Sequence, residues 1–167
     1  MAALRDRGVD YLMPTDAQGD PVGDEPLIAS LAANEDPRLR QALIALFLLE
    51  PLLAQHVPDI AEQLEMPARI ELIAHYMAAV YLQSMWRIRL DHYLPPTPDL
   101  PDYYSVSNQL PGPDDEYGKA GLYALADWHA RHVPWRANHL SEYESVTGLL
   151  LGRLQNRARK NVTAPTG

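Results

Sequence analysis

Apolar residues recur along the chain at the three- and four-residue spacing of one face of an α-helix. The clearest stretch covers 67–93 and stops before Pro95, because the residue that precedes a proline disfavours helical geometry. A second stretch begins at Asp36 and Pro37, a good N-cap residue followed by the residue that suits the first helical position. Its residues 42–49 are apolar on every side, which predicts a buried central helix.

Weaker apolar patterns predict further helices at 26–33, at 115–131 and, after Pro134, at 135–160. After Pro51 a short kinked helix is expected to continue to about residue 56. These stretches predict an all-α fold, an irregular helical bundle of about four to six helices with a long Pro-rich loop.

The domain organisation follows from the same pattern. Residues 1–25 are rich in turn-forming residues and are expected to form an irregular N-terminal segment, in which 9–13 could pair with 21–22 as a short hairpin. Residues 26–160 form one helical domain, and 161–167 form a disordered tail. The loop 95–113 contains six prolines, and a loop of this length is often functional or wrapped over the core.

Composition narrows the classes of function. The chain has no cysteine, which excludes disulfides, thiol nucleophiles and cysteine-ligated metals. The net charge of −8 makes binding to nucleic acid unlikely as a default, and no apolar run is long enough to cross a membrane. We therefore expect a cytoplasmic, acidic protein. No Gly-rich phosphate loop, nucleophile elbow or His-Glu-x-x-His motif is present, and no cofactor is predicted.

One short motif carries possible catalysis. Arg87 and His92 are separated by four residues near the end of the predicted helix 67–93. This spacing resembles the Arg-x(4–6)-His motif of HEPN-type helical ribonucleases, although Ile88 replaces the polar residue that usually follows the arginine. The resemblance implies an arginine that serves the scissile phosphate and a histidine that transfers a proton, or a helical protein associated with a nucleotidyltransferase. The same two residues would also suit a helix end, where they bind carbonyl groups.

A set of histidines forms a weak candidate metal site. His129 and His132 lie three residues apart on one predicted helix, and His139 precedes Glu142 by three residues on the next. Histidines at this spacing can chelate a metal, but none of these spacings matches the Glu-x-x-His pairs of carboxylate-bridged iron bundles. Helix caps and surface polar pairs explain the same residues, so no metal is predicted.

An aromatic set favours a protein partner. The chain has nine tyrosines and one phenylalanine, and amphipathic aromatic residues are common at interfaces. The set consists of Tyr103, Tyr104, Trp128 and Trp135. The sequence thus predicts a non-catalytic module that binds a protein partner or forms a homo-oligomer. The HEPN-like ribonuclease and a small-ligand or metal-binding bundle remain as alternatives.

Overall fold

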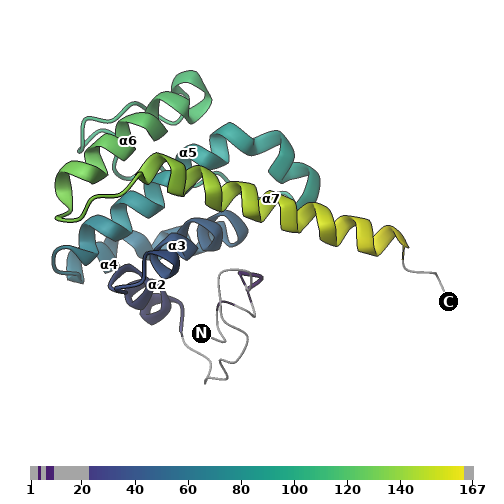
Figure 1. The fold of residues 1–167 in the computed structure, drawn as a ribbon, viewed down its shortest axis with the longest axis horizontal. Helices are drawn as coiled ribbons and strands as arrows, with labels where there is room; N and C mark the ends of the chain where they lie inside the picture. The colour runs from purple at the N-terminus through teal and green to yellow at the C-terminus, as the bar shows by residue number, and fades with distance from the viewer. Residues whose placement is uncertain (1–3, 5–6, 10–22, 164–167) are drawn as a thin grey trace.

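The computed structural model describes residues 4, 7–9 and 23–163, and within these residues the fold is all-α, as the sequence predicts (Figure 1). The elements follow in the order α2 (Asp24–Ala32), α3 (Pro37–Leu49), the 3-10 helix η2 (Pro51–His56), α4 (Val57–Gln63), α5 (Ala68–Tyr93), the 3-10 helix η3 (Asp115–Gly118), α6 (Lys119–His132) and α7 (His139–Thr163). The hairpin predicted within residues 1–25 lies outside the described residues.

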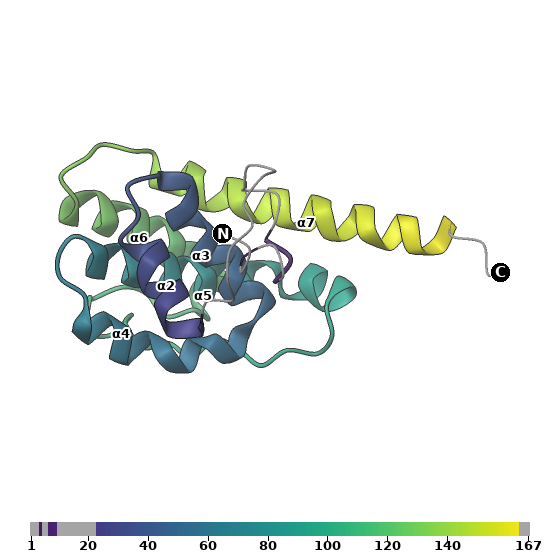
Figure 2. The same cartoon turned by 90° about the horizontal axis from the view of Figure 1, so that it is seen from below.

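Helix α5 is the centre of the bundle, because α2, α3, α4, α6 and α7 all pack against it. Its residues 70–83 are buried on every side, as are residues 42–48 of α3. The two views show α7 running along the bundle, with its second half extending past the other helices (Figures 1 and 2). Any polar residue in the middle of α5 must therefore find its partners on neighbouring helices.

The start of α3 confirms the prediction made at Asp36. The Asp36 side chain accepts a hydrogen bond of 2.9 Å from the backbone N–H of Arg38, and Pro37 occupies the first turn. No single described helix is long and apolar enough to cross a membrane. Helix α3 and the segment Pro51–Gln63 reach that length and composition only together, across a bend of 116°.

Several predicted helix boundaries are wrong. Helix α7 continues to Thr163, so residues 161–163 of the predicted disordered tail are helical, and the helix predicted at 115–131 is divided into η3 and α6. The last helix begins at His139 rather than at residue 135, because the Asn138 side chain accepts a hydrogen bond of 3.1 Å from the N–H of Ser141 and caps the helix there. Residues 133–138 instead form a connection that carries Trp135 back over Arg40. The short helix expected up to residue 56 is the 3-10 helix η2, and a separate helix that the sequence pattern does not predict, α4, follows it to Gln63.

The Pro-rich segment between α5 and η3 is fastened to α5 by side chains of that helix. Carbonyl groups of the loop accept hydrogen bonds from Tyr76, Tyr81, Gln83 and Ser84, at 2.6 to 3.0 Å. The Gln83 side chain also accepts one from the N–H of Leu100. A segment with six prolines has few N–H groups for a backbone ladder, so helix side chains satisfy its carbonyls instead.

Helix α6 lies directly on the Tyr81 ring. A Cβ atom at Gly121 would come within 2.0 Å of that ring, so only glycine permits the contact. Gly118 just before α6 has a φ of +87°, and a Cβ there would lie 2.4 Å from the Tyr81 carbonyl oxygen. These two glycines set how closely α6 approaches α5, and therefore how far its histidines reach into the bundle.

Replacing Gly121 by alanine should destabilise the protein by about 3 kcal/mol, because the new methyl group forces α6 away from Tyr81. Urea unfolding followed by circular dichroism measures this change. Gly148→Ala is the matched control: it is also helical, nothing lies within 4 Å of its Cβ position, and it should stabilise by up to about 1 kcal/mol. Equal stability of the two variants would contradict the close approach.

Candidate functional site

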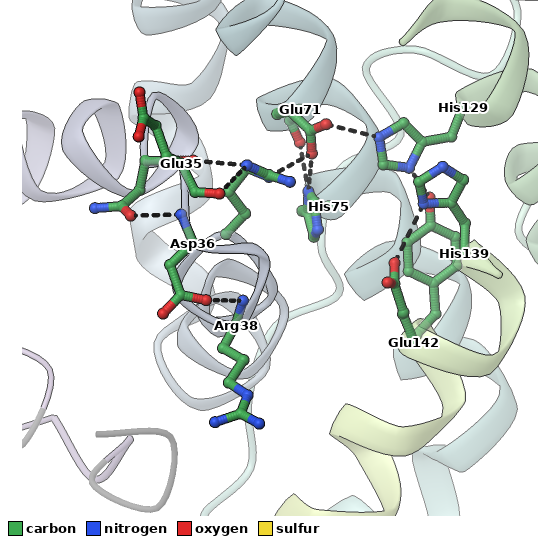
Figure 3. Close-up of polar contacts among 11 residues, drawn as sticks. Glu35, Asp36, Arg38, Glu71, His75, His129, His139 and Glu142 are labelled. Carbon is green, nitrogen blue, oxygen red and sulfur yellow. Dashed lines mark hydrogen bonds and ion pairs between the residues drawn. The ribbon is translucent and has the colours of Figure 1, made fainter. Parts of the chain in front are cut away.

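Five polar side chains meet in the interior of the bundle, and we call them the Glu71 cluster. They are Arg40 on α3, Glu71 and His75 on α5, His129 on α6 and His139 on α7. Each is at most 8% exposed, and Glu71 and His129 are 1% exposed. Charged and polar groups are rarely buried to this extent unless they are paired or functional. Figure 3 shows Glu71 facing His75 and His129.

The Glu71 carboxylate is the common contact of the cluster. Its Oε1 lies 3.2 Å from Nε2 of His129, and its Oε2 lies 3.3 Å from Nε of Arg40 and 3.4 Å from Nδ1 of His75. None of these approaches is aligned as a hydrogen bond, so both carboxylate oxygens keep lone pairs without an aligned donor among the described residues. The three distances are therefore those of ion pairs, and the Glu71 carboxylate can still accept hydrogen bonds.

The ionisation of the cluster follows from burial and charge. Burial raises the pKa of Glu71, but the contacts with His129 and His75 and the charge of Arg40 outweigh it and hold this pKa below its usual range. Burial lowers the pKa of His75 to about 4 and also lowers the pKa of His129. At neutral pH the cluster therefore contains an ionised Glu71, a charged Arg40 and two neutral imidazoles.

His129 links Glu71 to a buried tyrosine. Its Nδ1 lies 2.6 Å from the Tyr143 hydroxyl, whose pKa burial raises well above its usual value, so the hydroxyl keeps its proton and can donate a hydrogen bond to Nδ1. The hydrogen of the neutral ring then belongs on Nε2, which faces Glu71. The row Tyr143–His129–Glu71 thus has one arrangement of protons, all directed toward the carboxylate.

His139 forms a second pair beside the first. Its ring stacks on the His129 ring with centroids 3.8 Å apart, and its Nδ1 lies 3.3 Å from a carboxylate oxygen of Glu142 (Figure 3). Its Nε2 is buried and has no hydrogen-bond partner among the described residues. With Nδ1–H directed to Glu142, the Nε2 of a neutral His139 ring carries a lone pair.

A pocket of about 910 Å³ lies over these groups, and we call it the Glu71 pocket. Its walls come from the end of α2, the start of α3, the connection between α4 and α5, and the connection between α6 and α7. Its lining includes all five members of the Glu71 cluster together with Glu142, Leu64, Met66, Pro67 and Trp135. Its size suits a small organic ligand, for which pockets of about 300–1,000 Å³ are typical.

In the structure, Arg87 and His92, the two residues of the ribonuclease-like motif, have different partners. Arg87 forms ion pairs with Asp99 and, at 3.7 Å, with Asp91. His92 is exposed and its ring contacts that of Tyr93. Arg87 lines a separate pocket of about 980 Å³ that does not include His92.

The predicted aromatic set is divided among three places. Tyr103 and Tyr104 pack on the Tyr76 ring, next to the Pro-rich segment. Trp128 is buried at 5% exposure. Trp135 lies at the Glu71 pocket, where its ring is 4.9 Å from the Arg40 guanidinium carbon. Of the four residues, Trp135 is the one that lines this pocket.

The structure brings His129, His139 and Glu142 together but leaves His132 apart. His132 is exposed, its ring stacks on Trp128, and its Nδ1 lies 2.7 Å from the Trp128 carbonyl oxygen. Among the described residues no three His, Asp or Glu side chains are placed to hold one metal ion. The Arg40 guanidinium beside Glu71 also supplies the positive charge that a metal would otherwise bring.

Spacing along the chain points to His129 and His139 of the Glu71 cluster, but as weak metal ligands and not as neighbours of a buried carboxylate. Spacing along the chain does not point to Arg40, and it marks Glu71 and His75 only as helical neighbours of each other. The sequence marks Glu71 and His75 in one further way. Each is a polar residue among residues that the helix buries, as Glu71 is between Ile70 and Leu72. Comparison of the chain with protein-family models, curated proteins and solved structures finds no match, so its function has to be argued from geometry.

Stability should fall as the pH decreases from about 6.5 to 4. The native state keeps His75 neutral down to about pH 4, whereas the unfolded chain binds this proton near pH 6.5, so acid favours unfolding. This difference is worth up to about 3 kcal/mol, and the lowered pKa of His129 acts in the same direction. The lowered pKa of Glu71 removes further stability at still lower pH.

Urea unfolding at pH 7 and pH 4.5 measures this dependence. His75→Asn keeps a donor near the Nδ1 position and should flatten the change, whereas the exposed His92→Asn should leave it as in the wild type. The effect acts on a cluster that Arg40, His129 and His139 reach from three other helices, so the variant should reduce the slope rather than abolish it. A wild-type stability that is constant over this range would contradict a buried neutral His75.

Proposed function

We propose that this protein is a small-ligand-binding helical bundle whose binding site is the Glu71 pocket. The observation that carries the proposal is that two residues lining a pocket of ligand size, Glu71 and His139, have buried polar atoms with no aligned hydrogen bond among the described residues. A buried polar group without a partner costs about 1–3 kcal/mol, and each such group calls for an explanation. A bound molecule that donates to these atoms supplies one.

The construction of the site supports the same proposal. Four helices contribute its polar groups, and neighbouring side chains fix their orientation: Tyr143 behind His129, and Glu142 beside His139. Apolar side chains such as Leu64 and Met66 form other parts of the lining. A few oriented polar groups in a largely apolar pocket are the usual composition of a small-molecule site.

Binding of a fragment library, monitored by NMR on isotope-labelled protein, tests the proposal. Hits should shift the Trp135 indole and the His75 and His139 ring signals. Ala68→Phe places a ring in the pocket and should weaken these hits at least about tenfold, whereas Ala130→Phe, outside the Glu71 pocket, should not. Hits that bind elsewhere and are indifferent to Ala68→Phe would contradict the proposal.

The protein-partner hypothesis is our second candidate, and exposed aromatic surface favours it. Tyr103 is 37% exposed and Tyr104 lies beside it, so the Pro-rich segment presents tyrosine to solvent. Trp135 belongs to both candidates, whereas Tyr104 does not line the Glu71 pocket. The HEPN-like ribonuclease has less support, because acidic side chains already hold Arg87 and no contact links it to His92.

Sedimentation of a Tyr104→Ala variant separates the two candidates. If the aromatic set mediates association, Tyr104→Ala should weaken assembly while fragment binding at Trp135 stays unchanged. If the Glu71 pocket is the functional site, Tyr104→Ala should leave both measurements unchanged. Loss of fragment binding in Tyr104→Ala, without unfolding, would count against the pocket as an independent site.

A further inference from the structure

The polar atoms that the Glu71 pocket leaves without aligned partners include three acceptors. Glu71 is ionised at neutral pH and its two oxygens can only accept. Nδ1 of His139 lies 3.3 Å from a Glu142 oxygen, and its buried Nε2, which has no hydrogen-bond partner among the described residues, is an acceptor when the ring carries its one hydrogen on Nδ1. The hydrogen on Nε2 of His129 already faces Glu71. A ligand that satisfies these three acceptor atoms must therefore donate hydrogen bonds to them.

The buried cation of the pocket, Arg40, is held by several groups of the protein itself. Arg40 donates from one terminal nitrogen to the carbonyl oxygens of Asn34 and Glu35, at 2.7 and 3.1 Å. Its Nε faces Glu71, and the guanidinium lies over the Trp135 ring. Arg40 is thereby fixed to the protein on several sides, which leaves little of it to bind the carboxylate or phosphate of a ligand.

The charge of the pocket lining also favours a positively charged ligand over an anion. Besides Glu71, the pocket is lined by the carboxylates of Glu35, Glu65 and Glu142, against two guanidiniums. Arg136, Glu35 and Glu65 are exposed, so the more buried part of the lining has the carboxylates of Glu71 and Glu142 against the Arg40 guanidinium. An excess of carboxylates around a partly enclosed pocket attracts a positive group and repels an anion.

From these observations we propose that the Glu71 pocket takes an organic amine in its ammonium form, with an apolar body. The ammonium group donates to a Glu71 oxygen and to Nε2 of His139. The body lies against apolar lining such as Leu64, Met66 and Trp135. An ammonium has donors in three directions and pairs with the buried carboxylate, so the desolvation of both charges is offset. This inference rests on the proposed function and specifies its ligand class.

A matched series of ligands tests the inference on the full-length protein. The probes are 2-phenylethylamine, 2-phenylethanol and phenylacetate, which share an aromatic body and differ in the polar group. Isothermal titration calorimetry at pH 7 should give the amine an affinity at least about tenfold above that of the alcohol, with phenylacetate the weakest. This ranking needs no variant, so it remains decisive even if changes at Glu71 impair folding.

Two variants test whether the charge of Glu71 causes the preference for the amine over the alcohol. Glu71→Gln keeps the shape of the side chain and removes its charge, so the preference for the amine over the alcohol should fall about tenfold. Glu62→Gln removes an exposed carboxylate outside the pocket lining and should leave that preference unchanged. Thermal unfolding of each variant checks that the fold is kept.

The outcomes separate this inference from the proposed function. If the alcohol or phenylacetate binds as tightly as the amine, or if the amine does not bind in the pocket, the ligand class is wrong. The proposed function then still stands as long as library fragments bind in the pocket and lose affinity in Ala68→Phe. If the amine binds but Ala68→Phe does not weaken it, the amine lies elsewhere and the inference is overturned. If no fragment binds in the pocket, both proposals fail.

Discussion

The arrangement of this protein depends on one buried carboxylate. Glu71 lies in the first turn of the central helix, at a place where α5 is surrounded by other helices, and is 1% exposed. An isolated charge there would cost far more than the net stability of a domain of this size. Three of the surrounding helices bring polar groups to it: Arg40 from α3 and His129 from α6 contact the carboxylate, and His139 from α7 stacks on His129. Folding and the formation of this site are therefore the same event.

The compensation is enough to keep Glu71 ionised but does not use its full capacity to accept hydrogen bonds. Nδ1 of His75 lies 2.7 Å from the Glu71 backbone carbonyl and 3.4 Å from the carboxylate, so its hydrogen bond goes to the backbone. Arg40 divides its donors between loop carbonyls and the carboxylate. A purely structural ion pair would gain from closer and better-aligned contacts. Because the Glu71 carboxylate can still accept hydrogen bonds, the cluster is a candidate binding site and not only an ion pair that stabilises the fold.

The sequence predicts the fold better than the site. Helical periodicity and the Asp36–Pro37 start place α3 and α5 nearly to the residue, because these signals are local. The start of α7 is misplaced because two helix-start signals compete there: Pro134 suggests one start, and the Asn138 cap supplies the other. The site could not be predicted in the same way, because Arg40, Glu71 and His139 come from three helices. Spacing along the chain does not reveal which helices pack together. Spacing alone draws attention to His129 and His139 for another chemistry, that of metal ligands.

The hydrogen bonds that hold the Pro-rich segment limit the insertions and deletions that this protein can accept during evolution. Loops ordinarily accept insertions and deletions, since few of their atoms have fixed partners. Here the carbonyls of Pro98, Pro101, Pro111 and Pro113 each meet a particular side chain of α5. Adding or removing one residue between any two of these prolines would shift the remaining carbonyls out of register with the helix. The longest irregular stretch of the described chain is thus a part whose length is strictly constrained.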